Sequence, residues 1–177
     1  MSPEIELKFA ERFWFMRPRE DTNQGDCIDD LYAAFGMECG DGWEGLFWEL
    51  CTEIENLYKE YPHAPRVIPV QIKEKYGAMV VYVHFSDDPI PEQIGELSAH
   101  AKPKSKEFDN DFCNKVYDLI DKYESNSEFI CESCGAVGCL RTDRGWWQTL
   151  CDDCNAKQKA EQEAWLKKYV EKEYAED

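Results

Sequence analysis

The sequence lacks the features of membrane proteins, secreted proteins and histidine-dependent enzymes. No apolar stretch approaches the roughly 20 residues that a membrane-spanning helix needs. The first ten residues, MSPEIELKFA, have neither the basic segment nor the apolar run of a secretory signal. Histidine occurs only at His63, His84 and His100, each alone in its part of the chain. We therefore expect a cytoplasmic protein that binds no membrane and uses no histidine cluster.

Positive charge is also scarce. The 177 residues include 20 Lys and Arg against 37 Asp and Glu, a formal net charge of −17. Binding to DNA or RNA depends on Lys and Arg contacts with phosphates, so direct nucleic-acid binding is not expected. The same charge can steer the protein toward a basic surface on a partner protein. Solubility alone is the alternative explanation, and composition does not separate the two.

Cysteine, in contrast, is plentiful, with nine copies. Four form two Cys-x-x-Cys pairs separated by sixteen residues, Cys131 with Cys134 and Cys151 with Cys154. Thiolates at this spacing are the ligands of closed, tetrahedral zinc sites, so the sequence predicts one structural Zn²⁺ per chain. Disulfides are not expected without a secretory route. The remaining cysteines should be free thiols, most of them buried: Cys27, Cys39, Cys51, Cys113 and Cys139.

The order of motifs around these cysteines is that of a treble-clef finger. A Cys-x-x-Cys-Gly turn precedes a segment with hairpin character near Gly145, and the second pair begins a helix. Four thiolates leave no open position for a catalytic water. Residues 135–150 also lack the histidine that treble-clef nucleases carry on the hairpin, so no catalytic residue is assigned. The segment does offer candidate partner-binding residues: Arg141, Arg144, Trp146 and Trp147.

Hydrophobic periodicity predicts an α+β fold. Apolar residues at helical spacing predict helices over residues 4–16, 43–61, 87–101, 108–124 and 152–175. The helix over 43–61 follows Gly40, Asp41 and Gly42, which break the chain, and its aromatic stripe is more typical of a core than of a partner groove. The terminal helix is polar enough to be mostly exposed.

Two β-branched segments, residues 66–73 and 78–85, predict an antiparallel strand pair joined by a turn that contains Gly77. Pro69 has no N–H for a ladder, so its strand should lie at an edge or carry a bulge. The helix over 43–61 should cover this pair. We expect residues 1–127 to form an α+β core domain, and residues 128–177 to form the zinc finger and terminal helix.

Three blocks of the sequence, taken together, resemble a family of uncharacterised bacteriophage and bacterial proteins. They are GMECGDGWEGLFWELCTEIE, VIPVQIKEKYGAMVVYV and CESCGAVGCLRTDRGWWQTLCDDC. The family pattern has a Cys-Gly-x-Gly-Trp helix, a VKEKFGGLRFY strand pair and a C-terminal cysteine-rich finger. Ala78, Met79 and Val80 replace the GLR of that pattern, and residues 96–112 resemble an insertion. The resemblance brings no catalytic residue with it.

The finger alone resembles that of the DksA/TraR group, regulators that bind RNA polymerase without binding DNA. That group has a long coiled-coil hairpin before the finger, whereas an aromatic α+β region stands there in this sequence. Three hypotheses follow. The first is a non-enzymatic, zinc-stabilised protein-binding module, phage-encoded, that binds or inhibits a host nucleic-acid-handling or defence protein. The second is a regulator of RNA polymerase. The third is a nuclease or hydrolase using Asp26, Asp29, Asp30 and Asp41.

Overall fold

The computed structural model describes residues 1–17, 31–86, 110–143 and 145–173. Several features named from the sequence fall outside these ranges: the helix over 87–101, Asp26, Cys27, Asp29, Asp30, His100 and Arg144. We call the described residues before 128 the body and residues 128–157 the finger.

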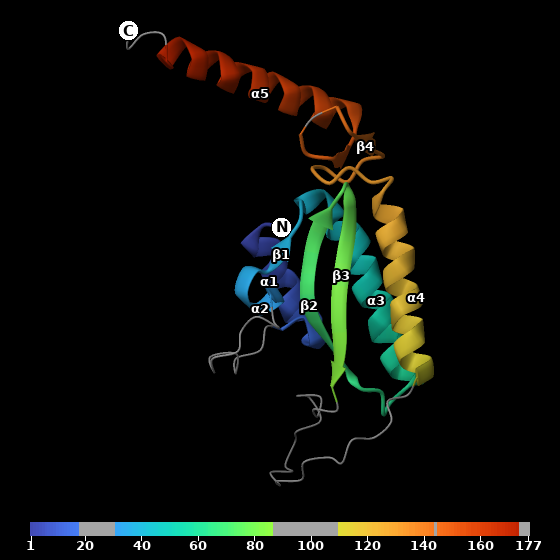
Figure 1. Ribbon diagram of the computed structural model, residues 1–177. Helices are drawn as coiled ribbons and strands as arrows, with labels where there is room; N and C mark the ends of the chain where they lie inside the picture. The colour runs from blue at the N-terminus through green and yellow to red at the C-terminus, as the bar shows by residue number, and fades with distance from the viewer. Residues whose placement is uncertain (18–30, 87–109, 144, 174–177) are drawn as a thin grey trace.

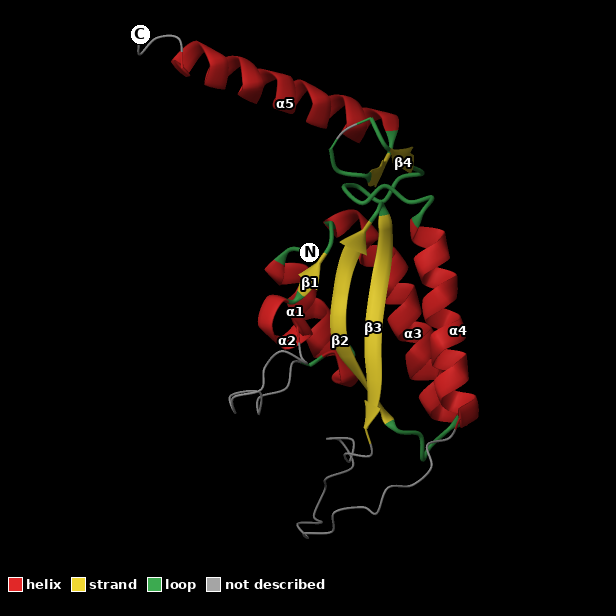
Figure 2. Cartoon of the chain, viewed as in Figure 1, coloured by secondary structure: helices red, strands yellow, loops and turns green. Residues whose placement is uncertain are grey.

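The sheet of the body is built on the predicted strand pair. β2 (Arg66–Lys75) and β3 (Ala78–Ser86) pair antiparallel, and the register shifts between Pro69 and Gln71, the bulge that the proline predicts. A short strand that the sequence analysis missed, β1 (Met37–Glu38), pairs parallel with β2. The order is β1-β2-β3, so the sheet is mixed and not purely antiparallel (Figure 2).

Two long helices cover this sheet. α3 (Glu44–Glu60) follows the 3₁₀ turn η3 (Asp41–Trp43), and α4 (Asn110–Ser127) packs beside α3 and against β3 (Figure 1). The apolar stripe of α3 is buried at Leu46, Phe47, Leu50, Cys51 and Ile54. The prediction that this stripe belongs to the core is therefore confirmed. The inward face of α4 is likewise buried, at Phe112, Val116, Ile120 and Tyr123.

The N-terminal helix is shorter than predicted. α1 (Pro3–Arg12) ends where Phe13 takes an extended conformation, with φ −114° and ψ 108°, and the turn η1 (Trp14–Met16) follows. The prediction of one helix over 4–16 was wrong beyond Arg12. All four residues from 13 to 16 are buried. A continuous helix would spread consecutive side chains around its axis, and the change of direction lets all four enter the core.

Aromatic rings fill much of the space between these elements. Phe9 is fully buried, with its ring centroid 5.2 Å from those of both Phe47 and Trp48. Tyr58 links this group to α4, because its ring lies 5.1 Å from that of Phe112. The small helix α2 (Leu31–Phe35) closes one side through Tyr32, whose hydroxyl donates to the backbone oxygen of Met16 at 2.8 Å.

The finger lies at the turn end of the β2–β3 pair. Its hairpin consists of β4 (Cys139–Arg141) and β5 (Gln148–Leu150), which pair antiparallel as predicted. α5 (Asp152–Glu173) begins at the second cysteine pair and points away from the body (Figure 1). The described part of α5 is mostly exposed, as its composition predicts. No helix in the described ranges is both long and apolar enough to cross a membrane.

Candidate metal centre and aromatic groove

The four predicted cysteines come together in the finger. The sulfur atoms of Cys131, Cys134, Cys151 and Cys154 all lie within 4.8 Å of one another. Cys134 Sγ and Cys151 Sγ are 3.7 Å apart, too far for a disulfide. Four sulfurs at a Zn–S distance of about 2.3 Å would be about 3.8 Å apart in a tetrahedron. The group can therefore hold a metal ion such as zinc with little rearrangement.

Backbone hydrogen bonds fold the first pair into a tight turn. The N–H of Gly135 donates to the oxygen of Cys131 at 2.8 Å, and the N–H of Cys131 donates to the oxygen of Ala136 at 2.7 Å. Gly135 has φ +75°, a conformation that glycine adopts without strain. The second pair sits at the start of α5, where the N–H of Cys154 approaches Cys151 Sγ at 3.4 Å. Unpaired N–H groups at a helix start favour negative charge there.

The cysteine pKa values reflect how closely the sulfurs and the neighbouring N–H groups are packed. Burial disfavours the Cys131 thiolate, but N–H groups of Cys151, Cys134 and Ser133 donate to it and lower its pKa to about 7. Cys154 behaves differently, because hydrogen bonding with the thiols of Cys134 and Cys151 raises its pKa. Crowded sulfurs cannot all lose their protons unless a cation balances the charge. The donor set thus fits a divalent, thiophilic metal.

The turn of the first pair rests on the segment before α3. A Cβ added to Gly42 would lie 2.3 Å from the backbone oxygen of Cys131 and 2.6 Å from the backbone nitrogen of Cys134. The N–H of Gly42 donates to the backbone oxygen of Glu132 at 2.7 Å. Trp43, fully buried, donates its Nε1–H to the backbone oxygen of Ile130 at 2.8 Å. Gly42 therefore allows the body to touch the metal-binding turn directly.

Glu132 is a functional residue that sequence reasoning missed. Glu132 lies between Cys131 and Cys134 in the sequence. Its side chain is buried, and its Oε1 accepts a hydrogen bond from the N–H of Gly40 at 3.0 Å. Its own N–H donates to the oxygen of Thr149 at 2.9 Å. Burial raises the pKa of this carboxyl. Glu132 thus joins the Gly40–Trp43 segment, the cysteine turn and β5.

The tip of the β2–β3 hairpin forms a second contact with the finger. The turn has two residues with positive φ, Tyr76 at 55° and Gly77 at 84°. The hydroxyl of Thr149 donates to the oxygen of Gly77 at 2.6 Å, inside the protein. The Cδ1 atom of Leu140 packs so closely on Gly77 that a Cβ there would lie 2.3 Å away. The turn conformation favours glycine at this position, whereas the exposed Leu140 side chain could move to accept a Cβ.

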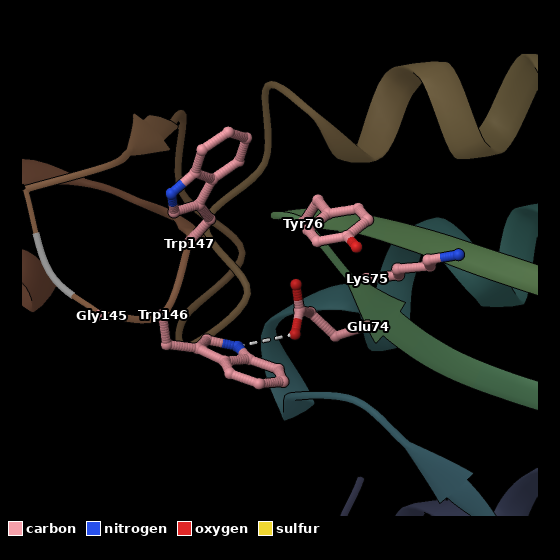
Figure 3. Close-up of a pocket in the computed structure, with 6 residues that line it drawn as sticks. All are labelled: Glu74, Lys75, Tyr76, Gly145, Trp146 and Trp147. Carbon is pink, nitrogen blue, oxygen red and sulfur yellow. Dashed lines mark hydrogen bonds between the residues drawn. The ribbon is translucent and has the colours of Figure 1, made fainter.

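A groove of about 360 Å³ opens beside this contact (Figure 3). The groove is lined by Glu74, Lys75, Tyr76, Gly145, Trp146 and Trp147. Trp146 donates its Nε1–H to Glu74 Oε2 at 2.8 Å. The rings of Tyr76 and Trp147 meet edge to face, with centroids 6.0 Å apart. Two predicted partner-binding residues, Trp146 and Trp147, therefore belong to one surface.

Arg141, another predicted partner-binding residue, has contacts within the finger. Its guanidinium donates to the oxygen of Leu150 at 3.1 and 3.2 Å and to Asp152 Oδ1 at 2.6 Å. Only 20% of its side chain is exposed. Arg141 ties β4 to the start of α5. Its sequence neighbourhood did not indicate this role, because the contacts depend on the hairpin register.

The other chemically active residues are dispersed. Cys39, Cys51 and Cys113 are buried as predicted, and burial raises the pKa of Cys39 to about 12, which keeps that thiol protonated. Cys139 is exposed and does not join the four-sulfur group. Asp41 accepts a hydrogen bond from the N–H of Ser2 at 2.6 Å. Within the described ranges, the four cysteines are the one cluster of potential metal ligands.

Comparison with known proteins adds no relative. No protein-family model, curated protein or solved structure matches the chain. The resemblances to phage proteins and to the DksA/TraR finger therefore stay predictions.

Proposed function

We propose that this protein is a non-enzymatic, zinc-stabilised binding module whose acidic surface engages a basic site on a partner protein. The observation that carries the proposal is the groove. Tyr76, Trp146 and Trp147 are 70%, 64% and 48% exposed, although each carries a large apolar ring. Adjoining exposed rings rimmed by polar groups mark interaction sites, and Trp and Tyr dominate binding energy at such sites.

The proposed metal is zinc, held in a treble-clef-like finger with a structural role. Support comes from the all-sulfur donor set, the β4–β5 hairpin between the two pairs and the helix that begins at the second pair. A bound ion would fix the position of Trp146 and Trp147, which lie between the pairs. The ion thereby orients the binding surface while the chemistry of binding belongs to the side chains.

Charge supports a basic partner. The formal charge of −17 would accelerate association with a positively charged surface, and this effect weakens as salt screens it. The resemblance to phage proteins makes a host nucleic-acid-handling or defence protein the proposed class of partner, since such proteins carry basic channels. An acidic module can occupy such a channel and exclude nucleic acid from it.

The experiment is a pull-down from a bacterial lysate with the zinc-loaded chain at about 50 mM and about 500 mM salt. We expect a specific protein that is recovered at low salt, is reduced at high salt and is lost with a Trp146→Ala/Trp147→Ala bait. Trp165→Ala is the matched control, because Trp165 is 61% exposed and lies on α5, outside the groove. Recovery of the same proteins by all three baits would contradict the proposal.

RNA polymerase is a second candidate partner. The cysteine cluster followed by the long, exposed α5 favours this alternative, because the finger resembles that of the DksA/TraR group. Immunoblotting the same eluates for polymerase subunits tests it. Polymerase recovered by wild type and lost with truncation after the finger would support a polymerase regulator. Eluates without polymerase would exclude that alternative.

A further inference from the structure

We infer that the groove is a cage for one cationic side chain, and that an arginine of the basic partner occupies it. The inference rests on the proposed function, since it assigns the chemistry that the same surface selects. Three aromatic rings and one carboxylate line the hollow, and an arginine guanidinium is the protein group that matches both.

The rings present the surface that attracts a cation. Figure 3 shows the Trp146 ring on one side of the Glu74 carboxylate and the Tyr76 ring on the other, with the Trp147 ring to the left of Tyr76 across an open space. Aromatic faces carry negative potential, and a cation within about 6 Å of a ring centroid is attracted to it. Several faces around one hollow add these attractions together in a partly desolvated place.

Glu74 supplies the negative charge, and two hydrogen bonds fix the position of its carboxylate. Its Oε1 accepts from the N–H of Gly77 at 2.6 Å, and its Oε2 accepts from Trp146 Nε1 at 2.8 Å. Each oxygen retains a further acceptor position, so the carboxylate can receive the paired N–H groups of a guanidinium. A carboxylate already fixed by two donors loses little freedom when a ligand arrives.

Lys75 does not fill the hollow. Its Nζ lies 5.5 Å from the centroid of the Tyr76 ring, within the range of a cation–π contact. Figure 3 shows the Lys75 side chain running away from the two tryptophans. The faces directed toward Trp146 and Trp147 are therefore available to a ligand. A neutral ligand could donate a hydrogen bond to Glu74 but would lack the ionic attraction, and an anionic ligand would be repelled by it.

The backbone of Tyr76 is strained in a way that serves this cage. Left-handed conformation is uncommon for a bulky residue, and Asn, Asp or Gly is preferred at the first position of a two-residue hairpin turn. Strain of this kind clusters at functional sites. Here it directs the ring against Trp147, where a turn built from Asn would leave the cage open on one side.

The test uses short peptides added to the zinc-loaded, full-length chain. The probes are acetyl-Gly-Gly-Arg-Gly-Gly-amide and versions with citrulline, lysine or trimethyllysine in place of arginine. Binding is followed through the indole N–H resonances of Trp146 and Trp147. We expect saturable binding of the arginine peptide with a Kd on the order of 1 mM, and at least tenfold weaker binding of citrulline, which has the same shape without the charge.

The matched variants separate binding from folding. Tyr76→Asn suits the turn, so we expect unchanged or higher thermal stability together with at least a tenfold loss of arginine-peptide binding. Trp165→Ala should bind as wild type does. Equal binding of the arginine and citrulline peptides, unaltered binding by Tyr76→Asn, or tighter binding of trimethyllysine than of arginine would each overturn the inference.

The outcomes also distinguish this inference from the proposed function. A lysate partner that depends on Trp146 and Trp147, combined with no discrimination between arginine and citrulline, would overturn the arginine cage and leave the binding module standing. Selective arginine binding without any groove-dependent partner would support the cage and contradict the proposed function.

Discussion

The body and the finger are stabilised by different means. The fully buried members of the main apolar cluster extend from Ile5 to Tyr123, and one finger residue, the partly buried Ile130, packs against them. In the finger, the buried apolar residues described are Cys131 and Leu150, with Thr149 and Glu132 buried beside them. Burial of apolar area contributes about 25 cal/mol per Å², so most of this stabilisation falls to the body. The finger needs another source of stability.

One such source is the contact between the two regions, and the proposed metal is another. The Gly40–Trp43 segment and the β2–β3 turn both meet the finger through short backbone approaches and buried hydrogen bonds. The difference teaches that the finger is not an independent unit attached by a linker. Its cysteine turn is packed against the body, so removal of the proposed metal should also weaken the contact between the two regions.

Removal of the metal should have the largest effect. Structural zinc supplies roughly 10 kcal/mol or more of binding free energy, and this energy is also folding energy. After chelation, or in Cys131→Ser, we expect amides of β4 and β5 to lose hydrogen-exchange protection while those of α3 and β2 keep most of theirs. Elemental analysis should give one zinc per chain.

Cys139→Ser is the control for this experiment, since Cys139 lies in β4 outside the four-sulfur group. It should retain the metal and the protection of wild type. Unchanged thermal stability of Cys131→Ser, or protection lost uniformly throughout the body, would break the contrast between the two regions.

Gly42→Ala should have the second largest effect on stability. The new methyl group would overlap the backbone of Cys131 and Cys134, so the two regions must separate locally, at a cost of about 1–3 kcal/mol in the free energy of unfolding. Gly45→Ala is the matched control, because nothing lies within 4 Å of its Cβ and it is an exposed residue of α3. That change should stabilise the protein by up to about 1 kcal/mol. Equal urea midpoints for the two variants would contradict close packing at Gly42.

Thr149→Val should weaken the second contact by about 1–2 kcal/mol. The substitution keeps the shape of the side chain and removes the hydroxyl that donates to Gly77, which leaves a buried carbonyl unpaired. The measurement is the free energy of unfolding together with the Trp147 indole resonance, which should shift because the groove adjoins this contact. Loss of stability without any shift would show that the contact does not position the groove.

Glu124→Gln should have the smallest effect on stability. This effect should be confined to the body. Burial raises the pKa of Glu124 above its usual 4.5, although the N–H of Val81 donates to Oε1 at 2.7 Å. A raised folded pKa means that the folded protein binds the proton more tightly than the unfolded chain. The ionised carboxyl therefore costs stability at pH 7, and this cost disappears as pH falls toward 4.5.

Urea titrations of wild type and Glu124→Gln at pH 7 and pH 5 test this. We expect the variant to be at least as stable at pH 7, with the difference shrinking at pH 5, and peptide binding in the groove to stay unchanged. A variant that is less stable at both pH values would show that the hydrogen bond to Val81 requires the carboxylate.

Sequence reasoning succeeded where the responsible residues are close in the chain. The spacing of the cysteine pairs predicted the four-sulfur group, and apolar periodicity predicted α3 and α4. Gly77 predicted the hairpin turn, and Pro69 predicted the irregularity in β2. Each of these features depends on local geometry or on a repeat of a few residues.

The remaining features depend on partners that are distant in sequence. Gly40 and Glu132 are 92 positions apart, and nothing near either residue indicates the other. Gly42 was interpreted as part of a chain break before the helix over 43–61, and the structure adds its contact with the cysteine turn. β1 has only two residues, too few for any period, and it pairs with residues more than 30 positions away. The groove combines a hairpin turn with a finger, so its rings became one surface only in three dimensions.

The length of α5 amplifies small movements at the four cysteines. The helix has 22 residues, which makes it roughly 33 Å long. Cys154 lies in its first turn and Cys151 directly precedes it, while the other end points away from the body. A rotation of about 10° at the sulfurs would carry the far end through roughly 6 Å. The arrangement of the four sulfurs would therefore set the direction of this long helix, and a ligand that rigidifies the finger would also fix the position of its far end.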